Sequence, residues 1–138
     1  MSGAQTIQDS REQTVRALLT LEAQGDLAEL PNVFPHPRYE LIGNSRVYDG
    51  LDVVVAYLTE RRNAFPDYKA EITRTYHAPD ALIAESWVTG THLGRIEGID
   101  PTSKGVHFTM ASFFLFEGDE LTCVRNYFDH ATIARQLA

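Results

Sequence analysis

Apolar residues in the first part of the chain recur at intervals of three and four, the spacing of one face of a helix. Residues 10–13 (Ser-Arg-Glu-Gln) match a capping box, in which side chains satisfy backbone donors at a helix start. Gly25 ends the pattern, and a short helical turn is predicted over residues 26–30, before Pro31. The first helix should therefore pack through a face formed by Val15, Leu18, Leu19 and Ala23.

A second helix is predicted between Asp49, as its N-cap, and Pro66, which cannot continue a helix. Residues 38–42, which precede it, are expected to be extended. Apolar positions again recur with helical spacing, which indicates a core-facing stripe rather than a cofactor site. That stripe consists of Leu51, Val54, Val55, Leu58, Arg62 and Phe65.

After Pro66 the chain is rich in β-branched and aromatic residues, which favour strands. Strands are predicted over residues 69–77, 82–92, 106–116 and 121–128, and a closing helix over residues 131–137. No linker or internal repeat divides the chain, so residues 1–138 are expected to form a single domain. Helices followed by consecutive strands predict an α+β fold, with an antiparallel sheet covered by helices on one face.

The last two strands can be paired by counting outward from a turn centred on Gly118 and Asp119. Side chains alternate along strands, so each strand contributes every second residue to a face. One face would carry Phe108, Met110, Ser112, Phe114 and Phe116 with Leu121, Cys123, Arg125, Tyr127 and Asp129. A slip of one residue in the turn would change these strand pairs. The other face would expose Phe113, Leu115, Val124 and Phe128, which predicts a homodimer that buries it.

Composition excludes several classes of protein. The net charge is −7, which disfavours binding to phosphate backbones and anionic lipid, and no apolar run is long enough to span a membrane. The lone Cys123 and the lack of a secretory signal predict a cytoplasmic protein. The five histidines show no HxH, HxxxH or HExxH spacing, so no metal site is expected.

Several short segments occur in the order and spacing of a known family: Phe65-Pro66-Asp67, Gly90-Thr91-His92-Leu93-Gly94, the segment 98–104, Tyr127-Phe128-Asp129 and Gln136-Leu137. From about residue 38 to its end, the chain resembles the SnoaL-like polyketide cyclases, or ester cyclases, of the NTF2-like superfamily. The resemblance implies an NTF2-like cone, in which a curved antiparallel sheet wraps N-terminal helices around an internal pocket. It also implies frequent dimers and aldol ring closure that uses no metal or cofactor.

The chain departs from the family pattern at two positions. Arg125 stands where many members have a Trp, four residues before the acid, and Ser103 stands where the loop usually has a Gly. A cation at residue 125 replaces a flat stacking surface, which argues against the polycyclic substrate usual in the family.

Asp129 is the leading candidate for proton transfer, and two interpretations stay open. Asp is a favoured N-cap, and residues 131–137 are predicted to be helical, so spacing alone favours a capping carboxylate with a lowered pKa. The resemblance favours a pocket acid that shuttles a proton, with apolar neighbours that raise its pKa. In that case the hydroxyl of Tyr127 or the ring of His92 would polarise the substrate oxygen.

The other candidates are substrate-binding residues. Arg125 is expected to form an ion pair, with Glu85 or Glu71 as its partner, or to bind an enolate or carboxylate. For His92 a structural bond to a loop carbonyl is the stronger reading, and His36 could line the pocket mouth. The remaining candidates for the pocket wall, which ordinary core packing would also explain, are Tyr57, Trp87, Met110 and Phe114.

Three functions are compatible with these residues, because the NTF2-like fold by itself does not define an activity. The first is a cofactor-free enzyme for cyclisation, isomerisation or dehydration of an apolar carbonyl compound, with Asp129 as the proton shuttle. The second is a non-catalytic domain that binds a small apolar molecule. The third is an epoxide hydrolase, which would need Arg125 and Asp129 to hold one water molecule.

Overall fold

A curved sheet of six strands, in the order β2-β1-β6-β5-β4-β3, is the framework of the molecule. The computed structural model describes residues 3–138. The strands are β1 (Arg38–Leu41), β2 (Arg46–Asp49), β3 (Lys69–Ala78), β4 (Ala81–Thr91), β5 (Gly105–Glu117) and β6 (Glu120–Tyr127). Neighbours are antiparallel except β1 and β6, which are parallel, so the predicted antiparallel sheet is instead a mixed one.

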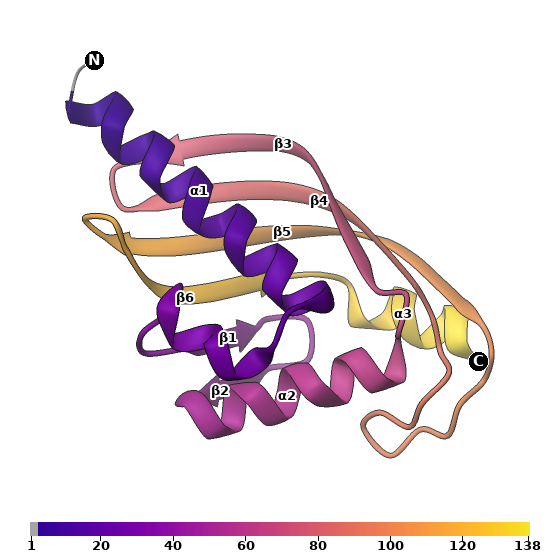
Figure 1. The fold of residues 1–138 in the computed structure, drawn as a ribbon. Coiled ribbons are helices and arrows are strands. Elements are labelled where there is room, and N and C mark those ends of the chain that lie inside the picture. The colour runs from indigo at the N-terminus through magenta and orange to yellow at the C-terminus, as the bar shows by residue number, and fades with distance from the viewer. Residues whose placement is uncertain (1–2) are drawn as a thin grey trace.

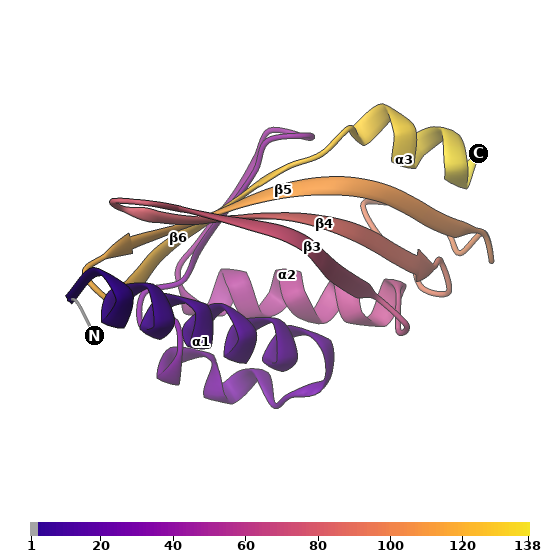
Figure 2. The ribbon, with the colours of Figure 1, turned by 90° about the horizontal axis from the view of Figure 1, so that it is seen from above.

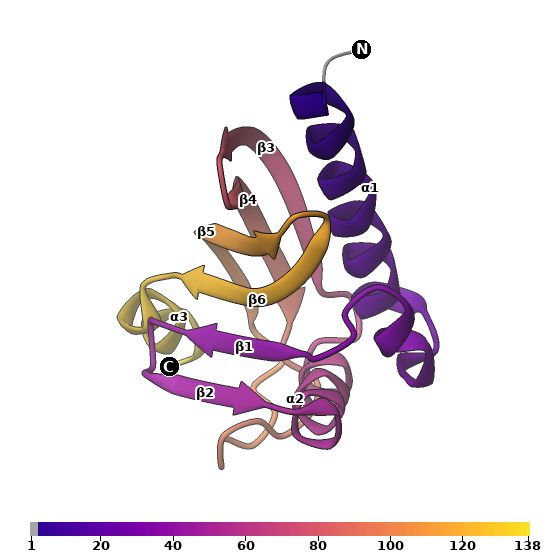
Figure 3. The ribbon, with the colours of Figure 1, turned by 90° about the vertical axis from the view of Figure 1, so that its left-hand side faces the viewer.

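Helices cover one face of this sheet, which confirms the predicted α+β arrangement (Figures 1 and 2). They are α1 (Gly3–Gln24), the 3-10 helix η1 (Leu27–Asn32) and α2 (Leu51–Ala64), whereas α3 (His130–Leu137) lies on the other side of the strands in Figure 2. Figure 3 shows α1 and α2 on the same side of the sheet, each crossing its strands. The main core lies between these helices and the strands and includes Val15, Leu18, Leu58, Phe114 and Val124. We call the helix-covered side of the sheet its inner face and the opposite side its outer face.

The first helix begins earlier than the capping-box motif indicated. Ser10 lies inside α1, where its carbonyl accepts a bond from the hydroxyl of Thr14, so the predicted start at residues 10–13 is wrong. The predicted end is correct, because the backbone N–H of Gly25 donates to Leu21 and closes the last turn. Of the predicted apolar face, Val15 and Leu18 are buried, Leu19 is partly buried and Ala23 is exposed.

Two arginines position α1 over the sheet. The Arg11 guanidinium donates to the carbonyl oxygens of Gly118, Ala78 and Pro79, in the turns of both hairpins. Arg62 of α2 donates to carbonyl oxygens in the last turn of α1 and just beyond it. These bonds hold the middle and the C-terminal end of α1 against the rest of the fold.

The second helix also begins differently from the prediction. Asp49 ends β2, a strand that the pattern missed, and its carboxylate pairs with Arg38 on the neighbouring strand. Gly50 occupies the N-cap position with φ of 103°, a conformation that favours glycine. Within the predicted stripe Leu51 is exposed, and the buried arginine of α2 is Arg61 rather than Arg62.

A β-bulge decides which residues of β6 face the helices. Phe116 pairs with Leu121 as predicted, but Leu115 pairs with Cys123, so Thr122 is an extra residue on β6. The predicted pairs beyond this point are therefore wrong by one residue. The bulge places Arg125 and Tyr127 opposite Phe113 and Ala111, on the outer face. The predicted dimer face changes accordingly, because Val124 is buried in the core instead of exposed.

The short helix α3 takes the place of a strand beside β5, beyond the end of β6 (Figure 2). Its Gln136 side chain accepts from the backbone N–H of His107 and donates to the His107 carbonyl. The amide thus satisfies an edge of β5 that has no neighbouring strand there, and Leu137 packs into a small cluster with Phe65 and Val106. No helix within residues 3–138 has the length and apolar character needed to cross a membrane.

Candidate functional site

The inner face of the sheet bounds two small chambers. The first has a volume of about 150 Å³ and lies among the sheet, α2, α3 and the loop between β4 and β5. Its walls are mostly apolar and include Phe65, Ile99, Val106, Ile133 and Leu137. The second chamber, of about 110 Å³, extends toward α1 and the start of β3. Four residues line both chambers and define what we call the waist: Arg61, Tyr68, Met110 and Asn126.

Arg61 reaches the waist from α2 and forms a buried ion pair with Glu22 of α1. Its Nη2 lies 2.6 Å from Oε1 of Glu22, and both residues are only 8% exposed. The hydroxyl of Tyr39 donates to the other carboxylate oxygen at 2.9 Å. The guanidinium also lies 4.0 Å from the centroid of the Tyr68 ring, a cation–π contact. The pair is therefore buried, and both of its residues line the second chamber.

Burial changes the proton affinity of the aromatic residues around this pair. It raises the pKa of Tyr57 to about 12 and also raises the pKa values of Tyr39 and Tyr68. For Arg61 burial opposes the charge, but Tyr68 and Glu22 keep its pKa well above the usual value. The phenols are thus neutral hydrogen-bond donors at physiological pH, and the guanidinium is a permanent cation.

Asn126 supplies a second donor at the waist. Ser112 on β5 donates its hydroxyl to Oδ1 of Asn126 on β6 at 2.7 Å, and both side chains are buried. This bond orients the Asn126 amide. Its oxygen is occupied by the Ser112 hydroxyl, which leaves its nitrogen available to the chambers. Among residues 3–138, no hydrogen-bond partner is found for the Nδ2 donors. The waist therefore presents hydrogen-bond donors between two chambers whose walls are mostly apolar.

A tight turn in the loop between β4 and β5 closes the mouth of the first chamber. Ile96 and Ile99 pair through reciprocal backbone hydrogen bonds and place both side chains against the chamber. Glu97, at the tip of the turn with φ of 50°, accepts from Nδ2 of Asn44 at 3.0 Å and pairs with Arg46 at 3.3 Å. The loop is thereby fastened to the β1–β2 turn across the chamber.

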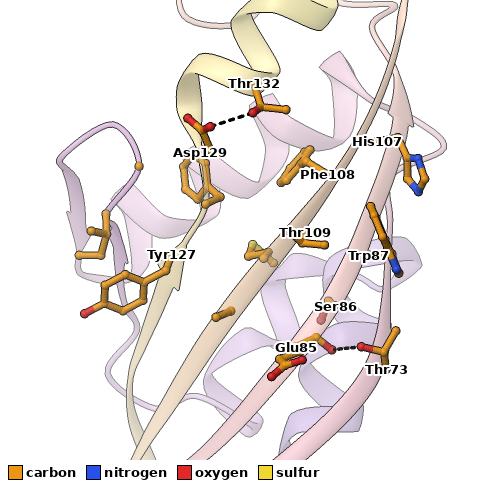
Figure 4. Close-up of a pocket in the computed structure, with 15 residues that line it drawn as sticks. Thr73, Glu85, Ser86, Trp87, His107, Phe108, Thr109, Tyr127, Asp129 and Thr132 are labelled. Carbon is orange, nitrogen blue, oxygen red and sulfur yellow. Dashed lines mark hydrogen bonds between the residues drawn. The ribbon is translucent and has the colours of Figure 1, made fainter.

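The outer face carries a wider, open groove of about 940 Å³ (Figure 4). Asp129 lies at one end of it, with its carboxylate turned toward Thr132 at the start of α3. Its oxygens accept from the backbone N–H of Ala131 at 3.0 Å and from the Thr132 hydroxyl at 2.8 Å. The Thr132 hydrogen bond lowers the pKa of this exposed carboxyl, the opposite of the effect of an apolar pocket. The capping interpretation of Asp129 is confirmed.

The structure divides most of the predicted site residues between the inner chambers and the outer groove. Tyr57 lines the first chamber, Phe114 lines the second, and Met110 lies at the waist. The outer groove takes Asp129, Tyr127 and Trp87, and it also reaches Met110. Trp87 lies against the ring of His107, with 4.3 Å between centroids. The predicted common face for Tyr127 and Met110 is therefore wrong, because the bulge separates them.

Three predicted residues line none of these spaces. Arg125 pairs with Glu40 at 2.6 Å, so an ion pair was correctly expected but its partner was not. His92 is fully buried, and its Nδ1 bonds to Thr102 of the β4–β5 loop, through a hydroxyl and an N–H rather than the expected carbonyl. His36 is exposed in the approach to β1.

Glu22 and Arg61 were missed, although the chain contains a signal for each. Glu22 follows Val15 by seven positions, and Arg61 follows Val54 by seven, so each charge lies on the buried stripe of its helix. A charged residue on an apolar stripe indicates a buried partner of opposite charge. Asn126 carried no such signal, because its face depends on the bulge. Among residues 3–138, no group of three or more His, Cys, Asp or Glu side chains is placed to hold a metal ion.

Comparisons with known proteins agree with this architecture. A family model for SnoaL-like polyketide cyclases matches residues 12–137. A structure from Jannaschia sp. CCS1, assigned as a SnoaL-like polyketide cyclase, has a TM-score of 0.83 at 16% identity and covers 94% of this chain and 92% of its own. TsrD from Streptomyces laurentii has a TM-score of 0.79 at 22% identity, with coverage of 94% and 96%.

A third structure, IdmH from Streptomyces antibioticus, assigned as a polyketide cyclase, has a TM-score of 0.74 at 20% identity, with coverage of 92% and 97%. At such identities the structural matches establish the NTF2-like fold alone. No protein of curated function matches the sequence.

Proposed function

The chain belongs to the SnoaL-like polyketide cyclase family, and from this premise we propose that it performs cofactor-free acid–base chemistry on an apolar carbonyl compound held in the inner chambers. Membership in this family supports a cyclase-type enzyme in general terms. The observation that supports the proposed location is the Arg61–Glu22 pair, which is buried and lines the second chamber. A charged pair shielded from bulk water interacts strongly with charge that develops on a substrate.

The proposed step is removal of a proton from the carbon next to the substrate carbonyl. Glu22, which lines the second chamber, would accept the proton, and the C–H electron pair would move onto the carbonyl oxygen to form an enolate. Arg61 and the amide of Asn126 would donate hydrogen bonds to that oxygen. In ring closure the enolate carbon then attacks a second carbonyl of the same molecule, and the new alkoxide takes the proton back from Glu22.

Asp129 remains the alternative proton shuttle, with Tyr127 or His92 as the group that polarises the oxygen. Its capping bonds and its lowered pKa give this alternative less support than Glu22. His92 is fully buried and lines neither chamber, and Tyr127 lies on the outer face. An epoxide hydrolase gains no support, because Arg125 is bound by Glu40 while Asp129 is bound by Thr132.

Hydrogen–deuterium exchange at the carbon next to a ketone tests the shared first step. β-Tetralone, a bicyclic ketone, is incubated in D₂O with the protein and followed by NMR. We expect the wild type to accelerate exchange and Glu22→Gln to slow it by about 100-fold or more, since general bases contribute roughly that factor. Asp129→Asn is the matched control and should retain the exchange rate.

The opposite pattern, with loss in Asp129→Asn and retention in Glu22→Gln, would place the chemistry in the outer groove. Circular dichroism checks that each variant folds. If Glu22→Gln does not fold, Glu22→Asp keeps the charge and moves the carboxylate, and it should slow exchange as well. No acceleration by the wild type would contradict the enzymatic proposal.

A non-catalytic binding domain is the second candidate, and one observation favours it. Both oxygens of Glu22 already accept hydrogen bonds, from Arg61 and from Tyr39, as in a purely structural ion pair. This function predicts a small apolar molecule that co-purifies unchanged with the protein. Mass spectrometry of the intact complex would detect it.

We also propose a homodimer that buries the outer face. Trp87, Tyr127 and Tyr76 expose 43%, 42% and 43% of their surface on or beside the groove, which is more aromatic surface than a monomer commonly leaves in water. Light scattering after gel filtration should give twice the mass of 15.5 kDa, and Trp87→Glu should reduce it to the monomer. A monomeric wild type would contradict this proposal.

A further inference from the structure

We infer that the inner cavity accepts a neutral molecule of one or two rings, with a single hydrogen-bond-accepting oxygen at the waist and apolar groups in the two chambers. The inference rests on the proposed function, because it names the substrate class of the same site. The inference excludes two classes of ligand: rigid molecules of four fused rings, and carboxylates.

The size of the ligand follows from the chamber volumes. Sites for drug-sized ligands usually enclose about 300 Å³ or more. The chambers measure about 150 and 110 Å³, so the volume of each one is below that value. They share the waist residues Arg61 of α2 and Asn126 of β6, so a rigid polycyclic molecule that spans both chambers would require α2 to move away from β6. The bonds from Arg62 to the end of α1 oppose such a movement.

The position of the oxygen follows from the donors at the waist. Glu22 takes one of the five N–H groups of the Arg61 guanidinium, and Arg61 faces both chambers. Asn126 adds the N–H groups that Ser112 leaves free by occupying the amide oxygen. Because Arg61 and Asn126 line both chambers, a ligand oxygen at this point can accept from both side chains.

The neutral charge of the ligand follows from the buried pair. Glu22 already compensates the charge of Arg61 at 2.6 Å, and Lys69, the other cation that lines the second chamber, lies 3.7 Å from Glu71. A carboxylate would lose its hydration and meet the Glu22 charge across the same guanidinium. A ketone or ester oxygen meets no such penalty, and its hydrogen bonds with Arg61 and Asn126 would strengthen as negative charge develops on it.

Equilibrium binding of a matched set of probes to the wild type tests these claims. β-Tetralone is compared with tetralin, which has the same rings without oxygen, with β-naphthoate, a carboxylate of similar size, and with progesterone, a tetracyclic ketone. Methyl NMR signals of Ile133 and Val124 report on the first and second chambers, and the indole N–H signal of Trp87 reports on the outer groove. We expect β-tetralone to shift the two methyl signals and to bind at least tenfold more tightly than the other three.

The role of the waist is tested with the double variant Ser112→Ala/Asn126→Leu, which removes the amide donor without leaving the Ser112 hydroxyl unpaired. It should reduce the preference for β-tetralone over tetralin by about tenfold. An unchanged preference would overturn the position of the oxygen, and the wild-type comparison decides the size and charge even if this variant does not fold.

The other outcomes separate this inference from the proposed function. Tight binding of progesterone or β-naphthoate at the chamber signals would overturn the size or the charge of the ligand and leave the site in place. A shift confined to the Trp87 signal would overturn both. Loss of deuterium exchange with retained β-tetralone binding would support the ligand class and contradict the enzymatic step.

Discussion

An arginine–glutamate pair lies on each side of the sheet. The two pairs have the same N–O distance and very different surroundings. Arg61 and Glu22 meet at 2.6 Å beneath the helices, with side chains 10% and 8% exposed. Arg125 and Glu40 also meet at 2.6 Å on the outer face, with side chains 34% and 17% exposed. The comparison shows that burial, more than the distance between the atoms, determines what a charged pair can do, because water screens the outer pair.

The same contrast applies to the groups that could move a proton. Asp129 on the outer side is exposed, and its bonds to Thr132 and Ala131 hold it in the charged form. Beneath the helices, burial favours the neutral form of Tyr39 and Tyr57, and the charges of Arg61 and Glu22 compensate each other. A reaction that develops charge is therefore affected more by the inner groups than by the outer ones.

The largest effect is expected from shifting the part of β6 that follows the bulge. Insertion of one alanine between Cys123 and Val124 would move each later residue of β6 by one position, which turns Arg125 and Tyr127 toward the helices and Asn126 outward. Burying an unpaired arginine should prevent folding, so circular dichroism should show loss of the native spectrum. Deletion of Thr122 is the control: it removes the bulge but keeps every later pair, so that variant should fold. A stable, cooperatively unfolding insertion variant would show that the faces of β6 are not fixed by this register.

The next largest effect should distinguish the two ion pairs directly. Arg61→Met leaves Glu22 buried without its counter-ion, which typically costs about 3–5 kcal/mol of unfolding free energy. Arg125→Met, the corresponding change on the outer face, should cost about 1 kcal/mol or less, because the Glu40 carboxylate keeps a second partner, Arg38, at 2.9 Å. Urea unfolding measures both. Equal losses would contradict the distinction between a buried and a screened pair.

A smaller effect on stability should appear at alkaline pH, and it should come from a buried tyrosine beneath the helices. Burial raises the pKa of Tyr57 from 10.0 to about 12, so the folded protein keeps this phenol neutral after the unfolded chain has ionised. Its contribution to stability is therefore complete below pH 10 and is lost as the pH rises toward 12. Ultraviolet absorbance of tyrosinate should show a late phase that Tyr57→Phe reduces. Tyr76→Phe, an exposed control, should leave the late phase unchanged.

Most of the secondary structure was predictable because its signals are local. Alternation and β-branched content located strands β3 to β6 within one residue at each end, and the apolar stripes located both long helices. The errors arose where local signals compete. Ser10 to Gln13 have the composition of a helix start, but the preceding residues extend α1. The parallel pairing of β1 with β6 joins segments far apart in the sequence, so no local pattern could indicate it.

The candidate site was less predictable because it depends on contacts between elements. Glu22 and Arg61 each interrupt an apolar stripe, and the sequence contained that sign, but their mutual contact depends on how α2 crosses α1. The bulge at Thr122 exchanged the faces of Arg125 and Asn126, so the residue expected in the pocket lies outside it and its neighbour lies inside.

The sequence by itself determined the fold class, the order of the elements and the family, because periodicity and short motifs depend on neighbouring residues. The tertiary structure alone decided which polar groups meet at the waist and which remain in water. One extra residue in β6 changes the side of every residue after it, and the packing angle of two helices sets the distance between their side chains. Such quantities depend on the whole molecule, since each is a balance of packing, hydrogen bonding and desolvation across several elements.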